Sequence, residues 1–149
     1  MIETHSKEET MALGYKIATM LPNGQTICLT GDLGAGKTTF VRGVAEGLGI
    51  KEVVQSPTFN IMKIYLKGVK PLIHIDAYRL ADIDTDIGLD EYIGYETGIT
   101  VIEWPEFIQK LIPENNIELI IKNNGGDNRL LTFKSKDKNL LERIKQCLL

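Results

Sequence analysis

The 149-residue sequence has few of the residues on which disulfide-rich, zinc-binding and membrane proteins depend. It contains two histidines and two cysteines, and Cys28 and Cys147 lie far apart with no C-x-x-C pair. These counts argue against a zinc cluster and a disulfide framework, so both cysteines are interpreted as small apolar residues of a strand and a helix. No apolar run approaches the roughly 18 residues that cross a bilayer, and the first ten residues do not resemble a secretion signal. We therefore expect a cytoplasmic protein with no membrane contact.

Positive charge is also scarce, because 17 lysines and arginines face 20 acidic residues and leave a net charge of −3. Nucleic-acid binding depends mainly on the neutralisation of phosphates by basic residues, and this balance provides no surface of that kind. The remaining composition, 43% hydrophobic and 25% charged, is typical of a globular protein. The length is that of one ordinary domain with its own core. The sequence therefore predicts a single domain over residues 1–149.

The apolar pattern and the turn residues predict strands and helices in an α/β arrangement. Strands are expected at about 25–30, 59–66, 72–75, 100–102, 117–122 and 130–134. Helices are expected at about 7–20, 38–48 and 105–111, and a closing helix contains the apolar stripe at 140–148. The last two strands flank a polar loop at 123–128 and suit an antiparallel hairpin. We expect an α/β fold with a mostly parallel central sheet, flanking helices and this C-terminal hairpin.

The first helix has a clear start and end in the sequence. Ser6 and Glu9 have the spacing of a capping box, in which each side chain satisfies a free amide at the helix start. Pro22-Asn23-Gly24 ends the helix. The helical spacing predicts one buried face, made of Met11, Tyr15, Ala18 and Leu21.

A glycine-rich motif follows the strand expected at 25–30. Gly31-Asp32-Leu33-Gly34-Ala35-Gly36-Lys37-Thr38 matches G-x-x-x-x-G-K-[ST] at every fixed position. Glycines let the backbone amides turn around phosphate oxygens, and the helix that follows directs its positive end at the same anion. Lys37 can then reach the β- and γ-phosphates, and the Thr38 hydroxyl is placed to bind Mg²⁺. The motif predicts nucleotide binding by a P-loop NTPase-like domain.

Two acidic residues follow expected strands and are candidates for the metal site. Asp76 comes directly after the strand at 72–75, and Glu103 comes directly after the strand at 100–102. Ligands of open α/β sheets bind at the carboxyl ends of the strands, so both carboxylates are expected near the phosphate loop. The sequence leaves open which of them contacts Mg²⁺ directly and which acts through water.

The segment Ser56-Pro57-Thr58-Phe59 lies between the helix after the loop and the next strand. In nucleotide switches, a hydroxyl at this position senses the γ-phosphate, which makes Thr58 a candidate binding residue. An ordinary turn, in which proline fixes the backbone, explains the segment equally well.

Four motifs together resemble the TsaE (YjeE) family, the small bacterial ATPase of the threonylcarbamoyladenosine tRNA-modification system. These are the phosphate loop extended through Thr39-Phe40, the Ser56–Phe59 segment, His74-Ile75-Asp76-Ala77-Tyr78-Arg79-Leu80 and Glu103-Trp104-Pro105. The phosphate loop alone is generic, whereas H-x-D-x-Y-R followed by E-W-P is specific. The resemblance spans nearly the whole chain.

The resemblance implies a role for each matching residue. It implies that ATP phosphates are bound by Gly34, Ala35, Gly36, Lys37, Thr38 and Thr39. It places Thr38 and Glu103 at Mg²⁺, makes Asp76 necessary for hydrolysis and places Trp104 beside the nucleotide. It also implies that the protein acts with TsaB and TsaD, where TsaD transfers the threonylcarbamoyl group to the adenosine next to the anticodon. Transfer RNA would then be reached only through these partners, which agrees with the acidic composition.

Three other functions could use the same loop. A small-molecule kinase usually closes an arginine-bearing lid over the transferred phosphoryl group, whereas the four arginines here are widely separated and no long insertion is present. A GTPase is disfavoured because no N-K-x-D motif occurs. A binding module in which ATP is a structural or regulatory ligand stays open, since no side chain is clearly placed to activate the attacking water.

Overall fold

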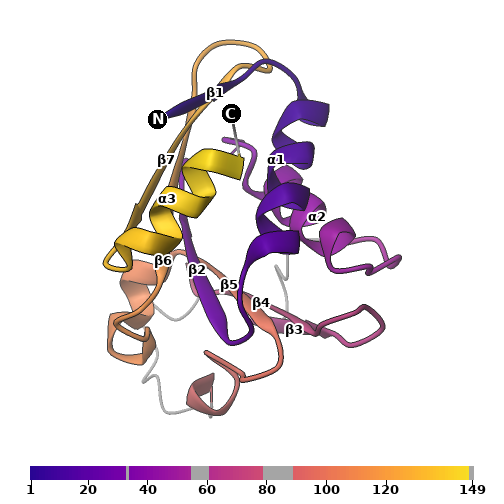
Figure 1. The fold of residues 1–149 in the computed structure, drawn as a ribbon, viewed down its shortest axis with the longest axis vertical. Helices are drawn as coiled ribbons and strands as arrows, with labels where there is room; N and C mark the ends of the chain where they lie inside the picture. Colours follow the sequence, from indigo (N-terminus) through magenta and orange to yellow (C-terminus); the bar gives the residue numbers. More distant parts are fainter. Residues whose placement is uncertain (33, 55–60, 79–88, 148–149) are drawn as a thin grey trace.

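The computed structural model describes residues 1–32, 34–54, 61–78 and 89–147. Within these residues, seven strands form one sheet in the order β1-β7-β6-β2-β5-β4-β3 (Figure 1). Their bounds are β1 (Ile2–Thr4), β2 (Gln25–Thr30), β3 (Met62–Tyr65), β4 (Leu72–Asp76), β5 (Ile99–Glu103), β6 (Ile117–Asn123) and β7 (Arg129–Ser135).

The four central strands, β6, β2, β5 and β4, pair in parallel, and the strands outside them pair antiparallel. This arrangement confirms the expected α/β fold with a parallel centre and an antiparallel C-terminal hairpin, β6–β7. The sequence did not predict β1. Three residues are too few to show an alternating pattern, and β1 forms because β7 offers it an edge to pair with.

Three helices pack on one face of the sheet: α1 (Lys7–Met20), α2 (Lys37–Gly47) and α3 (Lys138–Cys147) (Figure 1). Two short 3₁₀ segments, η2 (Leu89–Glu91) and η3 (Pro105–Leu111), contribute Leu89 and Ile108 to a second core on the other face. The helix expected at 105–111 is thus a 3₁₀ segment, with a kink at Ile108. Among the described helices, none has the length and apolarity needed to span a membrane.

The capping residues of α1 are as predicted, but part of its expected buried face is wrong. The Ser6 hydroxyl accepts a hydrogen bond from the Glu9 amide at 3.1 Å, while the Glu9 carboxylate accepts from the amide of His5 at 2.6 Å. Tyr15 is 45% exposed. The residues of α1 that are buried are Thr10, Leu13, Gly14, Ile17 and Ala18. The helix is rotated in this way because it packs closely on α2.

Glycines on both helices allow this close packing of α1 on α2. A Cβ atom at Gly14 would lie 2.5 Å from the carbonyl oxygen of Phe40, and one at Gly43 would overlap the carbonyl oxygen of Met11. A carbon atom cannot approach a carbonyl oxygen this closely, so only glycine fits at positions 14 and 43. Because α2 begins directly after the phosphate loop, this contact also fixes the position of the loop relative to α1.

Candidate nucleotide-binding site

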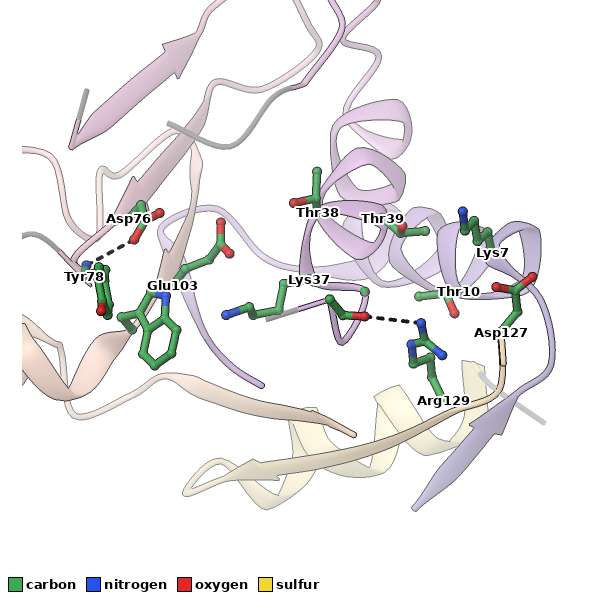
Figure 2. A pocket seen from close by; sticks show the side chains of 13 residues that line it. Lys7, Thr10, Lys37, Thr38, Thr39, Asp76, Tyr78, Glu103, Asp127 and Arg129 are labelled. Atoms are coloured by element: carbon green, nitrogen blue, oxygen red, sulfur yellow. Dashed lines mark hydrogen bonds between the residues drawn. The ribbon is translucent and has the colours of Figure 1, made fainter. Parts of the chain in front are cut away.

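The phosphate loop and both predicted acidic residues meet at one edge of the sheet. Strands β2, β5 and β4 are parallel neighbours, so their carboxyl ends lie together, and Asp76 is the register partner of Glu103. Asp76, Glu103 and the phosphate loop line a pocket of about 760 Å³, a usual size for a small-molecule site (Figure 2). The pocket is lined by Lys7, Thr10, Gly34, Gly36, Lys37, Thr38, Thr39, Asp76, Tyr78, Glu103, Trp104, Asp127 and Arg129.

The backbone of the phosphate loop has a conformation that requires glycine. Gly34 and Gly36 have φ angles of +79° and +102°, in the left-handed region that other residues rarely adopt. Gly36 directly precedes α2, whose first three residues, Lys37, Thr38 and Thr39, line the pocket. The first amides of a helix have no partners within the helix, so this turn provides donors for an anion.

Ala35 differs from its neighbours in the loop. Its side chain is buried in the core, and it does not line the pocket. Its amide donates to the Asp32 carbonyl at 3.0 Å, and its carbonyl accepts from the Arg129 Nε at 2.7 Å. Ala35 therefore holds the shape of the loop, and its contact with phosphate stays a prediction.

Lys37 lies in the pocket with its amine directed at an aromatic ring. The side chain is 7% exposed, and Nζ lies 4.3 Å from the centre of the Trp104 ring. Trp104 has a φ angle of +56°, unusual for a bulky residue, and its ring lies 5.1 Å from that of Tyr78 and 6.3 Å from that of Phe107. Strained residues of this kind gather at functional sites. The contact brings the loop lysine and the predicted nucleotide-adjacent Trp104 together.

The two carboxylates differ in how they are held. Glu103 is 4% exposed, and its Oε2 lies 2.6 Å from the Nε2 of His74. Asp76 is half-buried, and its Oδ1 accepts a hydrogen bond from the Tyr78 amide at 3.1 Å (Figure 2). Glu103 is therefore the more rigid of the two, and Asp76 is the more accessible to water.

The oxygen groups of this pocket fit Mg²⁺ bound together with a nucleotide. The described residues contain no group of three or more His, Cys, Asp or Glu side chains that could hold a metal ion alone. Mg²⁺ is usually held by one or two carboxylates together with phosphate oxygens and water, rather than by a complete protein cage. The Thr38 hydroxyl and the Glu103 carboxylate, both lining the pocket, are suitable ligands of this kind.

Arg129 lies against the phosphate loop, a position that sequence reasoning missed. Its guanidinium donates to the carbonyls of Ala35 and Gly34, at 2.7 and 3.3 Å, and to those of Gly126 and Asn128, at 2.7 and 2.8 Å. Four of its five N–H donors are used in this way. Arg129 therefore connects the hairpin β6–β7 to the loop (Figure 2). No local signal marks it, because its position depends on the strand order.

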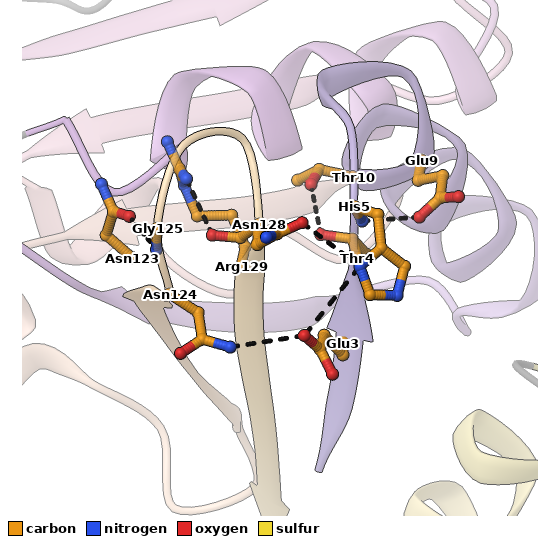
Figure 3. Close-up of polar contacts among 10 residues, drawn as sticks. All are labelled: Glu3, Thr4, His5, Glu9, Thr10, Asn123, Asn124, Gly125, Asn128 and Arg129. Carbon is orange, nitrogen blue, oxygen red and sulfur yellow. Dashed lines mark hydrogen bonds and ion pairs between the residues drawn. The ribbon is translucent and has the colours of Figure 1, made fainter.

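The N-terminal segment and the tip of the hairpin β6–β7 form the wall of the pocket opposite Asp76 and Glu103 (Figure 2). The hydroxyls of Thr4 and Thr10 lie 2.7 Å apart, and the His5 Nδ1 lies 3.2 Å from the Asn128 Oδ1 (Figure 3). The first contact joins β1 to the start of α1, and the second attaches the N-terminal segment to the tip of the hairpin β6–β7. Sequence reasoning also missed this wall, to which the side chains of Lys7, Thr10 and Asp127 belong.

The remaining predicted site residues either line the pocket or lie outside the described residues. Gly34, Gly36, Thr38 and Thr39 line the pocket. Thr58, the candidate γ-phosphate sensor, lies outside the described residues, together with the rest of its segment.

Comparison with known proteins identifies the family. The family model of the threonylcarbamoyl adenosine biosynthesis protein TsaE matches residues 4–131. The chain belongs to the TsaE family. The tRNA threonylcarbamoyladenosine biosynthesis protein TsaE of Bacillus subtilis is 46% identical over 87% of this chain and 82% of its own length. That of Treponema pallidum is 39% identical over 87% of this chain and 96% of its own length.

A solved structure agrees with this assignment to the TsaE family. The crystal structure of Bacillus subtilis YdiB superposes with a TM-score of 0.83 at 38% identity, covering 97% of this chain and 93% of that one. The resemblance inferred from the sequence motifs is therefore confirmed. The family's role is in the biosynthesis of threonylcarbamoyladenosine in tRNA.

Proposed function

We propose that this TsaE-family protein binds and hydrolyses ATP with Mg²⁺, and thereby supports threonylcarbamoyl transfer to the tRNA adenosine next to the anticodon. The observation that carries the proposal is the pairing of Asp76 with Glu103 at the strand ends, in the same pocket as the phosphate loop. A phosphate-binding turn, a lysine and two carboxylates are the parts that a P-loop ATPase requires. The cytoplasmic location expected from the sequence is part of the same proposal.

Each group of pocket residues has a separate role in the proposed reaction. Lys37 and the first amides of α2 bind the β- and γ-phosphates, while Thr38 and Glu103 hold the metal ion. Mg²⁺, when bound, neutralises the charge that develops on the phosphate oxygens. Asp76, which is half-buried at the pocket, accepts a hydrogen bond from the attacking water and orients it. The Lys37 amine lies 4.3 Å from the centre of the Trp104 ring, and we propose that it turns from the ring to the phosphates when ATP binds.

The same geometry supports a slow reaction in the isolated protein. Rapid P-loop hydrolases use an arginine to stabilise the charge of the transition state, and this raises kcat by about 10³–10⁵. Arg129 is the arginine that lines the described pocket, and carbonyl oxygens of the protein already occupy four of its donors. We therefore propose that TsaB and TsaD complete the site and that the protein reaches tRNA only through them.

Turnover of ATP, measured for the isolated protein and for its mixture with TsaB and TsaD, tests this function. We expect slow release of phosphate alone and at least tenfold faster release with both partners, and no release by Lys37→Ala in either condition. Equal rates with and without the partners would contradict the role of the partners. ATP that is bound but not hydrolysed in both conditions would instead favour a nucleotide-regulated binding module.

A further inference from the structure

The buried imidazole of His74 contacts the proposed metal ligand Glu103 directly. Its Nε2 lies 2.6 Å from the Glu103 Oε2, and the two side chains are 0% and 5% exposed. His74 lies on β4, two residues before Asp76, and side chains two residues apart on a strand point to the same face. Glu103 ends the neighbouring strand β5 and is the register partner of Asp76. The sheet therefore places the imidazole directly behind the two carboxylates of the pocket.

The direction of this hydrogen bond follows from the chemistry of the two groups. A carboxylate oxygen can only accept, so the Nε2 of His74 carries a hydrogen and donates the hydrogen bond to Oε2. The contact occupies one of the two carboxylate oxygens. The other oxygen, Oε1, belongs to a side chain that lines the pocket and can serve as a ligand there.

The second ring nitrogen of His74, Nδ1, shows that the environment of the ring does not satisfy all of its hydrogen-bonding groups. Its Nδ1 is buried and has no hydrogen-bond partner among the described residues. A buried polar atom without a partner destabilises the fold, whereas a leucine of similar size in this core would leave no such atom. Among the described residues the His74 side chain makes one hydrogen bond, to Glu103, and this bond is therefore the feature that distinguishes it from an apolar residue.

We propose that His74 is a positioning residue that orients the Glu103 carboxylate for Mg²⁺, an inference that rests on the proposed ATP and Mg²⁺ site. A carboxylate on a flexible side chain must otherwise lose rotational freedom when it binds a metal ion. Hydrogen bonds to metal-binding carboxylates fix them before binding, and removal of such a partner typically costs about 10–100-fold in metal affinity or activity.

The test measures the affinity for ATP with Mg²⁺ and with EDTA, for wild type and for His74→Leu. The ratio of the two dissociation constants reports how much Mg²⁺ strengthens ATP binding, and it needs no turnover. We expect His74→Leu to reduce this ratio by about 10–100-fold, with the affinity in EDTA unchanged. His74→Gln should restore most of the ratio, because its amide can donate from nearly the same place.

The matched control is Thr26→Val. Thr26 is likewise buried in the sheet, on β2, and its hydroxyl has no hydrogen-bond partner among the described residues, but it does not line the pocket. Thr26→Val should keep the wild-type ratio of dissociation constants. A lower ratio in His74→Leu but not in Thr26→Val would then come from loss of the contact with Glu103 rather than from a general disturbance of the sheet. Thermal unfolding of each variant checks that it is folded.

Each outcome decides one point. If wild type shows no strengthening by Mg²⁺, the proposed metal site itself is contradicted. If Mg²⁺ strengthens ATP binding by wild type and folded His74→Leu shows the same ratio of dissociation constants, only the positioning role of His74 is contradicted. Should His74→Leu fail to fold, His74→Asn replaces it, because its shorter amide cannot reach Glu103. If His74→Asn then shows the wild-type ratio, the proposal is overturned. If His74→Asn lowers the ratio and His74→Gln keeps most of it, the proposal is supported.

Discussion

The buried position of Cys28 on β2 controls the chemistry of its thiol. The residue is 4% exposed, and burial, with a smaller effect of the Glu118 charge, raises its pKa from 9.0 to about 12. The thiolate is the reactive form of cysteine, and it is therefore absent from the folded protein near neutral pH. This agrees with the interpretation of Cys28 as a small apolar residue.

We predict that Cys28 does not react with thiol reagents at pH 8 until the protein unfolds. The variant Cys147→Ser leaves Cys28 as the only cysteine and allows the reaction to be followed by absorbance, before and after addition of guanidinium chloride. Because the pKa is raised in the folded state, the free energy of unfolding should also fall as pH rises from 9 to 12, by at most about 1.4 kcal/mol per pH unit. Rapid labelling of the folded protein at pH 8 would contradict the burial of this thiol.

The four carbonyl contacts of Arg129 lead to a second prediction at this scale. Arg129→Ala should weaken ATP binding by about tenfold or more, because hydrogen bonds from a charged group contribute about 1.5–3 kcal/mol each and the phosphate loop loses two of them. Arg129→Lys should not restore binding, since an ammonium group cannot reach all of these carbonyls in one plane. Isothermal titration calorimetry measures the affinity.

The control for this prediction is Arg143→Ala. The Arg143 guanidinium also donates to a backbone carbonyl, that of Met20 at 3.3 Å, but it does not line the pocket. Its loss should leave ATP affinity unchanged. Equal affinities of wild type and Arg129→Ala would show that the loop keeps its shape without the hairpin.

At the scale of the elements, local patterns predicted those parts whose structure is determined within a few residues. Strand β2 has the predicted bounds, Gln25–Thr30, and α1 begins after its predicted cap, Ser6. The buried face of α1 was predicted less well, because the glycines that allow α2 to approach it have no side chain and therefore do not contribute to the apolar periodicity. Strand β1 was missed because it exists only through pairing with β7.

The contact between α1 and α2 predicts an unusual effect of Gly43→Ala. In an exposed helix, alanine in place of glycine stabilises by about 1 kcal/mol. At Gly43 the added carbon would overlap the Met11 carbonyl oxygen, so the two helices must separate, and we expect the free energy of unfolding to fall by about 1–3 kcal/mol. Glu46→Ala, at an exposed position of the same helix, should change it by less than about 0.5 kcal/mol. Urea denaturation measures both variants, and a stabilised Gly43→Ala would contradict the close packing.

At the scale of the whole molecule, the pocket is made from two halves that differ in how far the sequence predicts them. The half with the phosphate loop, Asp76 and Glu103 was predicted, because parallel strands of one sheet end at the same edge. The half with Lys7, Asp127 and Arg129 was not, because it depends on which strand lies beside β2. The pairing of His74 with Glu103 depends in the same way on β4 lying beside β5.

Binding of ATP with Mg²⁺ is the property on which the proposed function depends, and calorimetric titration of wild type and Lys37→Ala tests it most directly. We predict one ATP per wild-type chain, together with a change in the fluorescence of Trp104, the only tryptophan, as the Lys37 amine leaves its ring. Lys37→Ala should bind at least a hundredfold more weakly and yet stay folded, because a cation–π contact contributes only about 0.5–2 kcal/mol. Absence of ATP binding by folded wild type, or equal affinity of the two proteins, would contradict the proposed site.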